Sequence, residues 1–170
     1  MDLCALDKEL QSRILAEQAS AVVNLASVTR VRAGVDSGAA ITVWPEKLCS
    51  DYPTYPTAES KAGTEYYPAG EGGGIKDLGQ RYLQCSVNGK RRNIRARVCK
   101  VRKPLISAGE MVKAGHDIHL IGGEGKKPYA VHRKTGEITP ITCRNGVYEM
   151  DLEVFSYDGQ GNSRGRASPQ

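Results

Sequence analysis

Asp36, Ser37 and Gly38 form the stretch of this chain best suited to chemistry. An alternating apolar segment, 31–35, leads into them, and a second apolar run, 39–44, follows. An ionised carboxylate between two buried strands is costly unless it receives hydrogen bonds. A serine hydroxyl and a tight glycine turn can supply them, and glycine lets a second chain approach closely. The same three residues also suit an ordinary turn between surface strands.

A second informative stretch is the apolar pair Leu105 and Ile106, which runs directly into a predicted short helix. Ser107 and Glu110 have the spacing of a capping box at a helix N-terminus. Gly115 supplies the C-terminal stop. The pattern therefore predicts a strand that passes without a loop into a helix ending before Gly115.

The segment 81–101 has the pattern of a β-hairpin. Apolar residues alternate along 83–87 and again along 94–98, and Asn88 and Gly89 between them favour a type I′ turn. The return strand is rich in positive charge: Lys90, Arg91, Arg92, Arg95, Arg97, Lys100, Arg102 and Lys103. These side chains could contact RNA weakly or form a solvated face that blocks edge pairing. No aromatic residue interleaves with them, so the sequence does not predict a stacking platform.

The segment 45–74 is polar and rich in proline and glycine, which is typical of a long loop that is either functional or disordered. Within it, Gly72, Gly73 and Gly74 would let the tip of a hairpin at 66–75 open and close. A flexible surface loop would show the same composition.

These segments together resemble the retropepsin-like aspartic proteases of retroviruses and retrotransposons, over roughly 28–154. The family's active-site loop reads apolar-Asp-Ser/Thr-Gly-Ala, as here at 35–39. An apolar pair, usually a glycine, and then a helix follow its flap. Ser107 stands where that glycine is commonest, and copia-type members often have Leu-Leu-Ser at this point. The glycine stretch before Leu78 and the ending Asn-Gly-Val-Tyr at 145–148 are also similar to the copia-type branch.

The resemblance implies an all-β fold, a closed retropepsin-like β-barrel with one short helix, and endopeptidase activity on a polypeptide substrate. It implies a catalytic role for Asp36, with Ser37 and Gly38 holding its carboxylate in place. The residues that would contact substrate are Ala39, the flap glycines Gly72, Gly73 and Gly74, and the subsite residues Leu105 and Ile106. No cofactor and no metal is expected.

Peptide hydrolysis by carboxylates needs two of them in different protonation states. The chain offers a single Asp-Ser/Thr-Gly, because Asp158-Gly159 lacks the middle residue and Lys134-Thr135-Gly136 lacks the acid. A second Asp36 would therefore come from a two-fold related copy in a homodimer. The strand predicted at 147–154 is a candidate for part of that interface. A catalytically inactive module for dimerisation or RNA association, and a fragment active only within a polyprotein, remain as alternatives.

Length and composition suit one domain with short extensions, at 170 residues, 39% hydrophobic and 25% charged, with a net charge of +5. We expect an N-terminal helical extension over 1–27, the protease-like domain over 28–155 and a disordered tail over 156–170. Apolar residues recur at helical spacing near the N-terminus, at Leu3, Leu6, Leu10 and Ile14.

The histidines and cysteines do not form the pattern of a metal site or of a disulfide framework. His116 and His119 would lie on opposite faces of a strand, and no cysteine or carboxylate pattern completes a metal site around them. The five cysteines are scattered, without a Cys-x-x-Cys pair, which favours free thiols in a reducing compartment. No segment has the length and apolar character of a membrane span. We therefore expect a cytoplasmic location, which for a retroelement protein includes the element's own particle.

Overall fold

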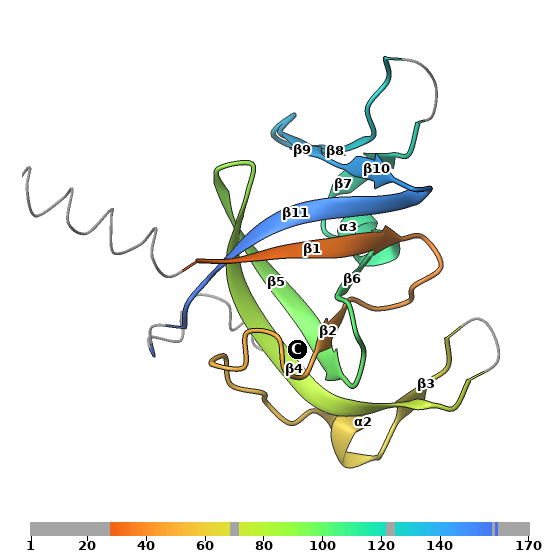
Figure 1. Ribbon diagram of the computed structural model, residues 1–170, viewed down its shortest axis with the longest axis vertical. Coiled ribbons are helices and arrows are strands. Elements are labelled where there is room, and N and C mark those ends of the chain that lie inside the picture. Colours follow the sequence, from red (N-terminus) through yellow and green to blue (C-terminus); the bar gives the residue numbers. More distant parts are fainter. Residues whose placement is uncertain (1–27, 69–71, 122–124, 158, 160–170) are drawn as a thin grey trace, which may run out of the picture.

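The computed structural model describes residues 28–68, 72–121, 125–157 and 159. The predicted helical extension at 1–27, the flap residues 69–71 and most of the predicted tail lie outside the described residues. Within the described part the chain is mostly β-strand, as the sequence predicts (Figure 1).

Eight strands form the main sheet, in the order β10-β11-β1-β6-β2-β5-β4-β3. Their bounds are β1 (Val28–Asp36), β2 (Val43–Pro45), β3 (Glu65–Tyr66), β4 (Ile75–Val87), β5 (Lys90–Cys99), β6 (Leu105–Ser107), β10 (Thr142–Arg144) and β11 (Val147–Phe155). One further pairing joins β11 to β4, through Glu153 with Ser86 and Val154 with Cys85. Because β11 also pairs with β1 and β10, it has partners on both of its edges.

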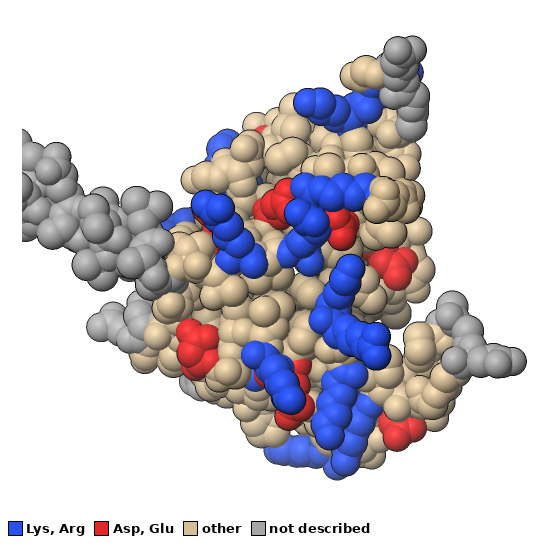
Figure 2. All heavy atoms as spheres, in the orientation of Figure 1, with Lys and Arg blue, Asp and Glu red and all other residues tan. Residues whose placement is uncertain are grey.

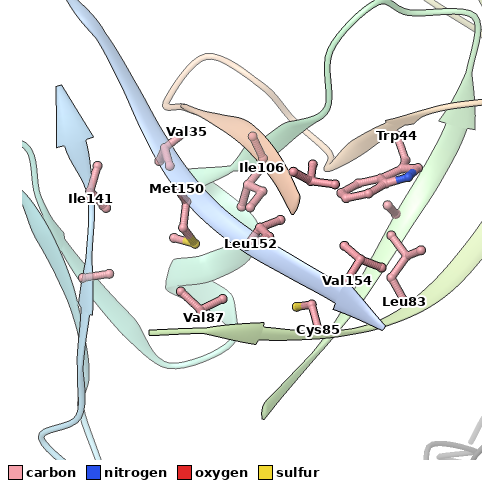
Figure 3. Packing of buried hydrophobic residues seen from close by; sticks show 14 of the residues in the cluster. Val35, Trp44, Leu83, Cys85, Val87, Ile106, Ile141, Met150, Leu152 and Val154 are labelled. Atoms are coloured by element: carbon pink, nitrogen blue, oxygen red, sulfur yellow. The ribbon is translucent and has the colours of Figure 1, made fainter. Parts of the chain in front are cut away.

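β1 forms because its apolar residues alternate, so one face can be buried. Val31, Ala33 and Val35 are buried, as predicted, while Arg30 and Arg32 on the other face are exposed. The strand is antiparallel to β11 along almost its whole length and parallel to β6 at its C-terminal end. Figure 3 shows Val35 beside Ile106 and Met150 in the core that this face helps to build.

The β4–β5 hairpin is also confirmed. Asn88 and Gly89 have positive φ angles of 51° and 75°, as the predicted turn requires. Leu83 and Cys85 of β4 and Ala96 of β5 are buried on one face. β4 begins at Ile75, earlier than predicted, because the pairing with β5 continues past an irregularity between Asp77 and Gly79.

The segment predicted as a long loop contains regular structure, and the prediction of a single short helix is wrong. A second helix, α2 (Ala58–Lys61), follows Thr57, whose side chain accepts a hydrogen bond from the Ser60 backbone while the Ser60 hydroxyl caps Thr57 in return. Serine replaces the usual Glu or Gln of this box, which weakens the signal. After α2, β3 pairs with β4.

The other helix, α3 (Ala108–Lys113), leads into a three-stranded sheet that the strand predictions alone did not reveal as separate. It consists of β7 (His116–His119), β8 (Tyr129–His132) and β9 (Ile138–Pro140), in that order. Gly115, with a φ of +96°, ends the helix as predicted. Ala130 of β8 and Ile141 are buried against the main core, which connects the two sheets.

Charges on the outer face of β1 and β11 are largely paired. Arg32 lies 3.4 Å from Asp151, and Arg144 lies 2.9 Å from the other oxygen of the same carboxylate. Figure 2 shows basic and acidic side chains next to one another on this face. Tyr157, which the sequence assigns to the disordered tail, packs against Tyr52 with ring centroids 5.3 Å apart, so the ordered domain extends slightly past β11.

Candidate active site

Asp36 is the last residue of β1, and its parallel partner on β6 is Ser107. The Gly38 backbone N–H donates a hydrogen bond of 2.7 Å to Asp36 Oδ1. Among the described residues, Oδ2 of Asp36 accepts no hydrogen bond, and the Ser37 hydroxyl, which is exposed, makes none. One oxygen of this half-buried carboxylate is therefore oriented by the turn, and the other accepts no hydrogen bond from the described residues.

Gly34 allows β6 to lie close to the strand that carries Asp36. A Cβ atom at this position would lie 3.0 Å from Cδ2 of Leu105. The Gly34 N–H also donates to the Pro104 carbonyl at 3.0 Å. This close approach belongs to the parallel pairing of β1 with β6 that places Asp36 opposite Ser107.

Ser107 joins the end of β6 to the chain that follows Asp36. It is fully buried, and its hydroxyl donates to the Ala39 carbonyl at 2.6 Å while accepting from the Glu110 N–H at 3.2 Å. Its own N–H donates to Oγ1 of Thr42, at 3.1 Å. The Ser107 hydroxyl thus holds the loop after Asp36 through the Ala39 carbonyl and caps α3 through the Glu110 N–H.

Glu110 does not complete the predicted capping box with Ser107. Its Oε2 instead accepts a 2.7 Å hydrogen bond from the Thr42 N–H. The Ser107 N–H is already satisfied by Thr42, so the carboxylate is available to the loop rather than to its own helix. Glu110 consequently connects α3 to the segment after Asp36, a contact that no sequence motif indicates.

The two predicted subsite residues on β6 differ in their surroundings. Leu105 is half-buried beside Gly34, whereas Ile106 is 6% exposed and belongs to the core. Ile106 lines a largely apolar cavity of about 310 Å³ between α3 and β5, together with Ile94, Met111 and others, and Asp36 is not part of its lining. Leu105 is thus the better placed of the pair to face the Asp36 side of the sheet.

The glycines predicted for the flap lie in the connection between β3 and β4, whose pairing of Tyr66 with Ile75 makes this segment a hairpin. Gly72 and Gly73 are exposed. Gly74 is half-buried, and a Cβ atom there would lie 2.9 Å from Cβ of Glu65, so a larger residue would push the two arms apart. The predicted hairpin exists, with its tip partly outside the described residues.

Asp77 is a buried acid that the sequence did not single out. Its Oδ1 accepts from the Gly79 N–H at 2.7 Å, and its Oδ2 accepts from the Tyr66 hydroxyl at 2.6 Å and lies 3.5 Å from Arg97. Burial and the adjacent Asp77 carboxylate raise the pKa of Tyr66. Asp77 therefore anchors β3 to the base of the hairpin, and both of its oxygens are occupied.

No family model, curated protein or solved structure matches this chain. Within the described ranges, no three histidine, cysteine or acidic side chains gather in a way that could hold a metal ion. The four cysteines in this part of the chain, Cys49, Cys85, Cys99 and Cys143, are free thiols. The helices that are described are too short to cross a membrane.

Proposed function

We propose that this chain is one subunit of a homodimeric, retropepsin-like aspartic endopeptidase that processes a retroelement polyprotein. The observation that carries the proposal is the carboxylate of Asp36, which is held by the Gly38 N–H at the end of β1, while the buried hydroxyl of Ser107 holds the following loop through the Ala39 carbonyl. An ionisable group fixed by the backbone yet open on one side suits general acid–base work.

The dyad consists of Asp36 from each of two chains, sharing one proton. The deprotonated carboxylate takes a proton from water as the water oxygen bonds to the peptide carbonyl carbon. The protonated carboxylate supplies the proton that the amide nitrogen needs when the C–N bond breaks, so the pair ends with the same number of protons. Asp77 is not a substitute for the second acid, because its oxygens are buried and bonded.

The exposed hydroxyl of Ser37 supports an arrangement in which the active-site loops of two chains meet. It lies next to Asp36 and makes no hydrogen bond among the described residues, so it is available to the partner's loop. Gly38, which is also exposed, lets the second backbone approach. Ser37 and Gly38 together then hold the two carboxylates coplanar.

The closed barrel and the flap belong to the same proposal. The pairing between β11 and β4 supports a closed arrangement of β11, β1, β6, β2, β5 and β4. The β3–β4 hairpin closes over the substrate, with Gly72, Gly73 and Gly74 at its mobile end. Ala39 contacts the peptide backbone and Leu105 shapes a subsite, while Ile106 stays in the core.

Asp36→Asn tests this proposal, with Asp117→Asn as the matched control because Asp117 is an exposed acid on β7. We expect Asp36→Asn to remove cleavage of a polypeptide substrate at acid pH while leaving a folded dimer, since two amides can neither accept nor share the proton. Asp117→Asn should cleave like the wild type. Full activity of Asp36→Asn would refute the assignment, and a wild-type dimer without any cleavage would favour the inactive module.

A further inference from the structure

The outer face of the β4–β5 hairpin is a surface that the proposed peptidase does not use. Residues directly opposite each other in an antiparallel pair share a face. Tyr82 lies opposite Arg95, and the flanking pairs on this face join two glutamines to an arginine and an asparagine. We call this surface the outer hairpin face and define it as Tyr55, Gln80, Tyr82, Gln84, Arg91, Asn93, Arg95 and Arg97.

Tyr55 is added to this face by a fixed backbone contact. The Tyr55 N–H donates to the Gln80 carbonyl, and the Gln80 N–H donates to the Tyr55 carbonyl, each at 2.8 Å. The approach is close enough that a Cβ atom on Gly79, whose φ is +129°, would lie 2.5 Å from the Tyr55 carbonyl oxygen. Gly79 therefore permits a third segment beside β4, and Tyr55 is held in place before any ligand arrives.

Two tyrosine rings lie together on this face and remain in solvent. Tyr55 is 45% exposed and Tyr82 is 54% exposed. Their ring centroids are 6.1 Å apart, and the rings are tilted by 59°. The side-chain amide of Gln80 donates a hydrogen bond to the Tyr82 hydroxyl, which fixes that ring further. An exposed, pre-ordered aromatic pair offers flat surface at a low cost in conformational entropy.

The charges on this face are positive, and none of its own residues is acidic. The Arg95 side chain is 66% exposed, and its guanidinium lies 4.0 Å from Glu110 at the rim of the cavity between α3 and β5. Arg91 lies over the Phe155 ring, 5.0 Å from its centroid. Arg97 forms salt bridges with Glu59 and Asp77, so its charge is already neutralised within the chain. At the end of this face near Arg91, Glu153 of β11 pairs with Ser86 of β4. The Glu153 carboxylate lies 3.8 Å from Nε of Arg30.

We infer that the outer hairpin face binds single-stranded nucleic acid. Bases stack on Tyr55 and Tyr82, Arg95 and Arg91 contact the phosphates, and the amides of Gln80, Gln84 and Asn93 meet base edges. Aromatic rings combined with arginine on an open sheet face suit unpaired strands, because duplex bases are already stacked inside the helix. Along the sequence the arginines have no aromatic neighbour, but strand pairing places Tyr82 directly beside Arg95.

The test is the fluorescence anisotropy of labelled single-stranded RNA and DNA of about ten nucleotides, with a duplex of equal length as a third probe. We expect Tyr82→Ala to weaken single-strand binding about ten-fold, in line with the loss of one stacked base. Tyr82→Phe keeps the ring and should bind like the wild type. Tyr67→Ala is the matched control, since Tyr67 is 72% exposed but lies outside this face.

Arg95→Gln should also weaken single-strand binding and make the affinity less dependent on salt concentration. Arg102→Gln is its control, because Arg102 is exposed but lies outside this face. Thermal unfolding of each variant confirms that the fold is intact. The inference is overturned if neither single strand binds at low salt, or if the Tyr67 and Tyr82 variants lose equal affinity. It is also overturned if the duplex binds as well, or if poly-glutamate competes as effectively as an oligonucleotide, since charge alone would then explain retention. None of these readouts depends on peptidase activity.

Discussion

At the scale of single residues, two Asp-x-Gly sequences show how the same local pattern serves different ends. In both, the backbone N–H of the glycine two positions later donates a 2.7 Å hydrogen bond to Oδ1 of the aspartate. Gly38 donates to Asp36, and Gly79 donates to Asp77. Asp77 is buried and also receives a tyrosine hydroxyl, whereas Asp36 keeps one oxygen free of protein hydrogen bonds among the described residues. The turn sets the geometry, and the surroundings decide whether the acid is structural or available for chemistry.

Glu110→Ala tests the connection between α3 and the active-site loop. It removes a 2.7 Å hydrogen bond from the buried Thr42 N–H to a carboxylate, so we expect the free energy of unfolding to fall by about 2 kcal/mol. Any peptidase activity should fall as well, because the loop after Asp36 loses its hydrogen bond to α3. Urea titration measures the loss, and Lys113→Ala, an exposed change on the same helix, is the control. Equal stability of the two variants would show that Glu110 does not hold the loop.

At the scale of elements, the strands were predictable where one face is buried, because alternation along β1, β4 and β11 records that burial directly. The Asn88-Gly89 turn and the stop at Gly115 follow from glycine's access to positive φ. Contacts between distant segments were not predictable. Glu110 with Thr42, and Tyr66 with Asp77, depend on which strands become neighbours, and no local propensity encodes that.

The junction of α3, β7 and β8 should respond to pH through His116. Burial, and to a lesser extent the nearby His132, Arg92 and Arg133, lowers the pKa of this imidazole. As the pH falls below about 6.5, the histidine of the unfolded chain takes up a proton before His116 of the folded chain does. The contribution of His116 to the free energy of unfolding is therefore fully present above that pH and is lost as the pH falls.

Equilibrium unfolding at about pH 7.5 and pH 5.5, on either side of the usual histidine pKa, measures the effect. We expect the free energy of unfolding of His116→Gln to change less between the two pH values than that of the wild type. His119→Gln is the control, since His119 is exposed, and it should change as much as the wild type. If His116→Gln loses as much stability on acidification as the wild type, another group is responsible.

At the scale of the whole molecule, the fold limits how two chains can meet. The sequence suggested that strand 147–154 contributes to the subunit interface, but β11 already has β1 on one edge and β10 and β4 on the other. A partner could therefore use the outer side chains of β11, not its backbone. The loop with Ser37 and Gly38 is exposed and remains available to a second copy.

A shared active site makes activity depend on concentration. We expect the rate per chain to fall on dilution below the dimer dissociation constant, because separated subunits each hold half of the dyad. Peptidase assays and mass measurements on the same dilution series test this. A constant rate per chain in samples that are monomeric by mass would contradict the shared site.

The most direct test of the central claim mixes wild-type chains with Asp36→Asn chains at a fixed total concentration, after subunits have been allowed to exchange. With equal amounts and random pairing, about a quarter of the dimers contain two Asp36 carboxylates. If the dyad is formed between chains, the activity should fall to about that fraction of the undiluted wild-type value, because a mixed pair lacks one of the two carboxylates. If each chain carries a complete site, the activity should fall only to about half, and the account of a shared Asp36 dyad would be contradicted.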